Sequence, residues 1–247
     1  MNLPASDPRA ADVSAAIVKG DVARLRQLLE RHPGLAAARI VDAEGTSRTL
    51  LHLAADWPGH FPNGAETVAL LTAEGAAVNE VAIHTDPRRP RETALHWAAS
   101  SDDLAVLDAL LDCGADIEAP GAVFTGGAPM SDAVVFAQWH AARRLLERGA
   151  RTTIWQAAAL GLLDRVKACC QDQPPPSEQI TNAFWHACRG GQQQTAEYLL
   201  SLGANPNWIG YDKRTPLQAA KDSGASPFVN WLRSIGAKLA EDLTPPR

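Results

Sequence analysis

Long apolar runs, tyrosine, methionine and paired cysteine motifs are all scarce in this sequence of 247 residues. No apolar stretch approaches the roughly 20 residues that a membrane-spanning helix needs, so a membrane partner is not expected. The N-terminus lacks a basic segment leading into an apolar run, which argues against a secretory signal. The four cysteines (Cys113, Cys169, Cys170 and Cys188) have no C-x-x-C spacing and are expected to be reduced thiols. Together these absences predict a cytoplasmic protein.

Clustered positive charge is also missing. The formal net charge is −5, charged residues make up 21% of the chain, and Lys and Arg are scattered along it. Because a phosphate backbone needs a concentrated basic surface, nucleic acid is not an expected partner. The densest basic segment, Arg88, Arg89 and Arg91, is interrupted by Pro90 and is interpreted as a solvated loop.

Sequence signatures of catalysis are absent as well. No G-x-S-x-G motif, glycine-rich phosphate loop or paired Cys/His metal signature occurs, so neither a cofactor nor a metal is expected. The glycines of GAVFTGGAP, residues 121–129, lead into a helix from a hairpin, and this context indicates a loop.

A Gly-Ala pair recurs after apolar helical stretches. The glycines are Gly75, Gly114, Gly149, Gly203 and Gly236, and two adjacent leucines precede each of the first four. The leucine pair indicates the buried face of a helix, and the glycine indicates its left-handed C-cap. Repetition at such intervals predicts stacked supersecondary units.

Alanine-rich helix starts precede several of these stretches: TLLHLAA from Thr49, TALHWAA from Thr93 and TPLQAA from Thr215. Threonine caps the helix, leucine fills the core between units, and paired alanines let neighbouring helices approach closely. At these residues the chain resembles the ankyrin repeat family, whose consensus joins T-P-L-H-x-A-A to a second helix ending in L-L-x-x-G-A-D. The resemblance implies an all-α helix-turn-helix solenoid of about seven units, some of them degenerate.

We expect one ankyrin-like repeat domain over residues 1–247. Its parts are an N-terminal capping unit (1–45), central units (46–171), a proline-rich connector (172–179) and C-terminal units with a tail (180–247). The connector is predicted from three consecutive prolines, which are incompatible with a helix and indicate extended chain.

Two insertions interrupt the second and third units. After Ala55 the chain reads DWPGHFPNGAET where a tight turn would suffice, and EVAIHTDPRRPRE separates Asn79 from Thr93. Insertions in a solenoid gather on one face, often the binding face. We therefore expect the first insertion (58–66) and the second insertion (81–92) to meet over a binding groove.

Tryptophan is over-represented, with seven residues against two tyrosines. Trp97 stands on a non-core side of its helix and Trp57 precedes a Pro-Gly pair beside the first insertion, so both are interpreted as lining a concave groove. Phe136 aligns with Trp57 at the end of an inner helix. Trp139 and Trp185 lie in helices rich in small residues and fit the core better.

The predicted contact residues lie on the inner helices and in the two insertions. They are Asp56, Trp57, His60, Phe61, His84, Asp86, Trp97, Ser100, Ser101 and Phe136. Among them His60, His84 and Asp86 are titratable and are the candidates for proton transfer if the insertions meet. The resemblance gives His52 and His96 a structural role instead, hydrogen bonding around the threonine turns.

Two functions remain open at this point. The resemblance implies non-catalytic recognition of a partner, here a protein segment bound in an aromatic-rich concave groove. The alternative is a small-molecule-binding protein or enzyme with a pocket roofed by the loops 58–66 and 81–92, which would hold a small organic ligand. A monomer is expected in either case.

Overall fold

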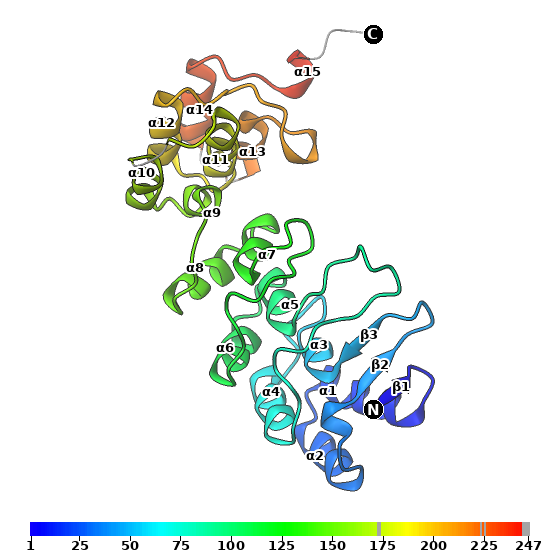
Figure 1. Cartoon of the computed structure of the whole chain (residues 1–247). Coiled ribbons are helices and arrows are strands. Elements are labelled where there is room, and N and C mark those ends of the chain that lie inside the picture. The colour runs from blue at the N-terminus through cyan, green and yellow to red at the C-terminus, as the bar shows by residue number, and fades with distance from the viewer. Residues whose placement is uncertain (172–173, 223, 225, 244–247) are drawn as a thin grey trace. The chain divides into compact units, whose positions relative to one another are not determined.

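The computed structural model of the chain describes residues 1–171, 174–222, 224 and 226–243 (Figure 1). These residues belong to two compact units, Met1–Arg151 and Thr152–Arg247. Both units consist mainly of helices that follow one another in helix-turn-helix pairs. None of the described helices is long and apolar enough to cross a bilayer.

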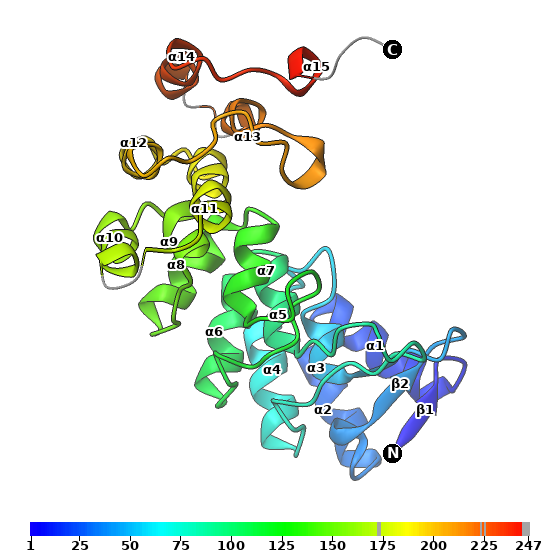
Figure 2. The ribbon, with the colours of Figure 1, turned by 45° about the horizontal axis from the view of Figure 1, so that its top comes forward.

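The first unit arranges four helix pairs in two rows (Figure 2). The pairs are α1 (Pro8–Lys19) with α2 (Val22–Arg31), α3 (Leu50–Ala54) with α4 (Gly64–Ala73), α5 (Ala94–Ser100) with α6 (Leu104–Asp112), and α7 (Pro129–Val135) with α8 (Trp139–Glu147). The first helices of the pairs contact one another in order, and so do the second helices. We call the row α1, α3, α5 and α7 the inner row.

Threonine and histidine fix the starts of two inner helices. The hydroxyl and backbone N–H of Thr49 lie 2.7 and 3.4 Å from Nδ1 of His52, and Thr93 contacts His96 in the same way. Nε2 of His52 donates to the carbonyl of Glu92 (3.0 Å), which precedes the next inner helix. Burial lowers the pKa of His52 to about 4, so the ring is neutral at pH 7. These contacts match the structural role expected for the two histidines.

The core lies between the two helix rows and is built from leucine and alanine. Leu95 and Leu51 of the inner row are each 1% exposed, and Leu107 and Leu110 of α6 are fully buried. The paired alanines of α5, Ala98 and Ala99, are also fully buried. Close approach of the inner helices thus depends on the absence of larger side chains at the alanine pairs.

A small three-stranded sheet, which the repeat pattern of the sequence does not predict, borders the inner row. It comprises β1 (Asn2–Pro4), β2 (Arg39–Val41) and β3 (Ser47–Thr49) in the order β1-β2-β3, with β1 parallel and β3 antiparallel to β2. Single antiparallel bridges, Ser47 with Ile83 and Val81 with Thr93, extend this pairing into the second insertion.

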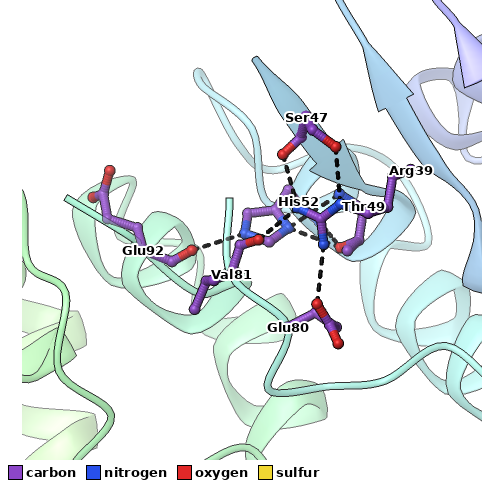
Figure 3. A network of polar contacts seen from close by, with 7 residues as sticks. All are labelled: Arg39, Ser47, Thr49, His52, Glu80, Val81 and Glu92. Carbon is purple, nitrogen blue, oxygen red and sulfur yellow. Dashed lines mark hydrogen bonds and ion pairs between the residues drawn. The ribbon is translucent and has the colours of Figure 1, made fainter. Parts of the chain in front are cut away.

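Arg39 ties the sheet to the second insertion (Figure 3). Its guanidinium donates to the hydroxyl and carbonyl of Ser47 at 2.8 and 2.9 Å, and to the carbonyl of Val81 at 2.6 Å. It also pairs with Glu80 at 3.0 Å. One side chain therefore satisfies backbone carbonyls of two neighbouring hairpins, which holds the base of the second insertion against β3.

The second unit contains three further helix pairs and a short final helix. They are α9 (Ile154–Ala159) with α10 (Leu163–Gln171), α11 (Ser177–Arg189) with α12 (Gln193–Ser201), α13 (Pro216–Asp222) with α14 (Ser226–Ser234), and α15 (Ala240–Leu243); a 3-10 turn, η2 (Tyr211–Lys213), precedes α13. α11 packs against both α9 and α13. Residues 177–179 of the predicted connector form the start of α11, and residues 172–173 of that connector lie outside the described residues.

Candidate functional site

An aromatic hollow lies on the inner row of the first unit. Its volume is about 230 Å³, and its lining comes from the end of α3, the end of the second insertion, α5, the loop after α6, and the end of α7. The lining residues are Asp56, Trp57, Glu92, Trp97, Ser100, Ser101, Val123 and Phe136. Six of these belong to the predicted contact set; Glu92 and Val123 do not.

The three aromatic rings of the hollow differ in exposure. Trp57 is 82% exposed and Phe136 is 41% exposed, so both present ring surface to solvent. Trp97 is half-buried, and its ring meets the edge of His52 at a centroid distance of 4.9 Å and an interplanar angle of 80°. Phe124, itself 72% exposed, adds a ring 5.9 Å from that of Phe136. Large apolar surface is thus left uncovered around the hollow.

Polar groups on the Trp57 side already have partners. Asp56 accepts from the guanidinium of Arg48 at 3.0 Å and from the backbone N–H of Trp57 at 2.9 Å. Burial raises the pKa of Asp56, and the charge of Arg48 opposes that shift. The hydroxyl of Ser100 donates to the carbonyl of Trp97 at 2.9 Å. The charge of Asp56 is therefore balanced within the chain.

Glu92 lines the other side of the hollow, and its charge acts on Asp132, which is buried in α7 and does not line the hollow. Burial raises the pKa of Glu92 to about 6, and a hydrogen bond from the Trp97 side chain acts in the opposite direction. Asp132 of α7 is 1% exposed; burial first, and the charge of Glu92 second, raise its pKa to about 8. Oδ1 of Asp132 accepts from the backbone N–H of Val123 at 3.1 Å. At pH 7 Glu92 is mostly ionised and Asp132 mostly protonated.

Two close backbone contacts position Glu92 and the first insertion. A Cβ on Gly121, whose φ is +138°, would lie 2.4 Å from the carbonyl oxygen of Arg91, so glycine is needed where the next hairpin passes. A Cβ on Gly20 would lie 2.1 Å from the carbonyl oxygen of Pro62. The end of the second insertion therefore lies against the hairpin before α7, whereas the first insertion lies against the turn between α1 and α2.

The first insertion places His60 at the rim of the hollow and Phe61 within the loop. The backbone N–H of His60 donates to Oδ2 of Asp103 at 2.6 Å, and Nε2 of His60 lies 3.1 Å from the carbonyl oxygen of Ser101. Phe61 is half-buried, and its carbonyl accepts from Gly64 at 3.2 Å. Neither residue belongs to the lining of the hollow.

His84 and Asp86 lie in a different place from His60. They line a second pocket of about 420 Å³ together with Asp42, Glu44, Thr46, Thr85 and Arg89. Nδ1 of His84 lies 3.5 Å from the hydroxyl of Thr46, and Asp86 pairs with the exposed Arg88 at 3.0 Å. The structure does not gather the three candidate proton-transfer residues in one pocket, because the second insertion extends the β2–β3 hairpin. In the part of the chain that is described, no cluster of three His, Cys, Asp or Glu side chains is arranged to hold a metal.

The remaining tryptophans named from the sequence are more enclosed. Trp185 in α11 is 1% exposed and donates its indole N–H to the carbonyl of Arg214 at 3.0 Å. The Trp185 ring lies 5.5 Å from the ring of Tyr211. Trp139 in α8 is half-buried. Trp185 accordingly serves the core of the second unit, as its small-residue surroundings predicted.

Comparison with known proteins identifies the repeat. Residues 13–121 match the family model described as ankyrin repeats in three copies, and this match confirms the predicted fold. An ankyrin repeat and KH domain-containing protein of Caenorhabditis briggsae is 28% identical over 191 residues, which cover 73% of this chain and 7% of that protein. The chain thus corresponds to a small part of that relative. The crystal structure of the human ASB11 ankyrin repeat domain is 19% identical, with a TM-score of 0.49, covering 89% of this chain and 96% of that domain.

Proposed function

Because the chain carries ankyrin repeats, we propose that it is a non-catalytic recognition module that binds a protein segment in the aromatic hollow of its first unit. Stacked repeats of this kind generally mediate protein contacts through the surfaces that their inner helices present. The observation that carries the proposal is the 82% exposure of Trp57 at the rim of a hollow that Trp97 and Phe136 also line.

The exposed rings support a binding role on energetic grounds. Leaving a large aromatic side chain in water forgoes about 2 kcal/mol of burial, and Trp57, Phe124 and Phe136 are all exposed around one hollow. Aromatic residues gathered in this way typically anchor a partner, because they bury much area with few rotatable bonds. Residues at three consecutive inner helices, α3, α5 and α7, line the hollow, so an extended segment could contact all three.

A small-molecule site or an enzyme receives less support. Pockets for drug-sized ligands usually measure about 300–1,000 Å³, whereas this hollow measures about 230 Å³. The second insertion reaches its rim through Glu92, but His84 and Asp86 line another pocket. We therefore do not place an acid or base catalyst at the hollow. The four free cysteines are compatible with our further proposal of a cytoplasmic location.

Peptide display provides the test. The full chain is panned against a library of random peptides, and the selected peptides are measured against the parent and against Trp57→Ala. We expect Trp57→Ala to weaken binding by about thirtyfold while the circular dichroism spectrum and the melting temperature stay close to those of the parent, since Trp57 is exposed.

Tyr211→Ala is the matched control, because Tyr211 is a 52% exposed aromatic residue of the second unit. It should leave peptide affinity unchanged. Selected peptides that bind Trp57→Ala and the parent equally well would place the recognition surface elsewhere and refute the proposal.

A further inference from the structure

The acidic wall of the aromatic hollow lacks a cation. Twelve ion pairs join the described residues, and none of them includes Glu92. The nearby basic residue Arg48 is already paired with Asp56 at 3.0 Å. Among the influences on the pKa of Glu92, burial dominates and no positive charge contributes. Glu92 is therefore a half-buried carboxylate whose charge nothing in the first unit balances.

Asp132 adds a second carboxyl next to Glu92. The same turn hydrogen bond follows α5 and α7: Asp103 N–H donates to the carbonyl of Ala98, and Gln138 N–H donates to the carbonyl of Ala133. The residue before Ala133, Asp132, therefore occupies in α7 the position that Trp97 occupies in α5. Its Oδ2 is buried with no hydrogen-bond partner among the described residues. A buried carboxyl oxygen without a partner is costly, and two neighbouring carboxyls repel each other when both ionise. Of the two carboxyls only Glu92 lines the hollow, so the Glu92 carboxylate is the charge that a ligand in the hollow would meet.

Aromatic faces complete the site. Trp97 of α5, Trp57 and Phe136 line the same hollow as Glu92. A cation over such rings gains electrostatic attraction, and the methylene stem of a long basic side chain gains apolar contact. A neutral or acidic side chain would bury the Glu92 carboxylate more deeply without supplying the positive charge that it lacks.

We propose that the aromatic hollow binds a basic side chain, lysine or arginine, of the recognised segment, with its charge on the Glu92 carboxylate and its stem against Trp97, Trp57 and Phe136. This inference rests on the proposed function and specifies which segments are recognised. His52 and His96 border the same helices, but their ring nitrogens are engaged with backbone carbonyls and threonines. Glu92 thus supplies the charge that selects the ligand.

Four peptide libraries test the charge selection with the full chain. They share random flanks and differ at one central position, which is arginine, lysine, norleucine or glutamate. Each library is passed over the immobilised parent, and individual retained peptides are then measured in solution. We expect retention of the arginine and lysine libraries, with about tenfold or greater weakening when the basic residue is replaced by norleucine.

Glu92→Gln is the decisive variant. It removes the charge and keeps the backbone carbonyl that accepts from His52, so the fold is retained. Glu92→Gln should bind the retained basic peptides and their norleucine counterparts about equally well, so the tenfold preference is lost. Glu44→Gln, whose residue lines the separate pocket with His84, should keep the preference. Thermal unfolding of both variants is recorded alongside.

The outcomes separate this inference from the proposed function. Peptides that depend on Trp57 but show no preference for a basic residue would overturn the inference and leave the proposed function standing. An unchanged preference in Glu92→Gln would overturn it as well. If no library is retained by the parent, both the proposed function and the charge selection fail together.

Discussion

Replacing Asp132 by asparagine should stabilise the protein, and increasingly so as the pH rises. Asp132 is 1% exposed, and its Oδ2 lacks a hydrogen-bond partner among the described residues. Burial, with a further contribution from the charge of Glu92, raises the pKa of this carboxyl from 3.8 to about 8. Asparagine keeps the shape of the side chain and an acceptor oxygen for the N–H of Val123, but it cannot ionise.

The sign and size of the effect follow from proton counting. Between the unfolded and folded pKa values of Asp132, 3.8 and about 8, the folded state keeps a proton that the unfolded state has released. The contribution of Asp132 to the free energy of unfolding therefore falls as the pH rises. One proton corresponds to about 1.4 kcal/mol per pH unit, so the advantage of Asp132→Asn should grow by up to that slope and level off above about pH 8.

Urea denaturation of the parent and of Asp132→Asn, in steps from about pH 5 to about pH 8, measures this slope. Far-ultraviolet circular dichroism and tryptophan fluorescence are followed together. Asp86→Asn is the control, since Asp86 is ionised and paired with Arg88 in the second insertion, and its effect should not grow in this range. The reasoning would be refuted if the difference in free energy of unfolding between the parent and Asp132→Asn stayed constant with pH, or if the variant were the less stable protein at about pH 8.

Two other predictions concern the core and the acidity of the hollow. Leu95→Ala should lower the free energy of unfolding by about 2–5 kcal/mol because Leu95 is 1% exposed between α5 and its neighbours; an unchanged urea midpoint would contradict its placement in the core. Basic peptides retained by the parent should bind more weakly below about pH 6, by up to about tenfold per pH unit, since protonation removes the charge of Glu92. Titration calorimetry should show no such loss of affinity at low pH for Glu92→Gln. An equal loss of affinity in that variant would mean that another group titrates.

The repeat and much of the hollow could be predicted because they depend on local patterns. The motif TALHWAA predicts both the helix that begins after Thr93 and the non-core position of Trp97. The Pro-Gly pair after Trp57 ends the preceding helix, and the Trp57 ring is left exposed to solvent. These features require only helical periodicity and the restricted backbone of proline.

Features that depend on contacts between distant segments could not be predicted in this way. The strands have three residues each, too few for an alternating pattern to be recognised, and β1 pairs with a segment far along the chain. Glu92 is held at the hollow by distant segments: its carbonyl contacts His52, and the hairpin before α7 passes close to Arg91, with Gly121 leaving room for it. The separation of His60 from His84 likewise depends on which neighbour each insertion contacts. Glu92 stands in a loop just before a helix start, and a single residue in a loop carries no periodic signal.

Because of the hydrogen bonds of Arg39, the length of the second insertion can change without moving its last residue. Arg39 holds Val81 and Ser47, and the bridges Ser47 with Ile83 and Val81 with Thr93 join both ends of the insertion to the sheet and to each other. Residues can therefore be added or removed between His84 and Pro90 while Glu92 stays where it is. During divergence of such proteins, or in a designed variant, that tip is a place where a second contact surface can be elaborated without altering the first.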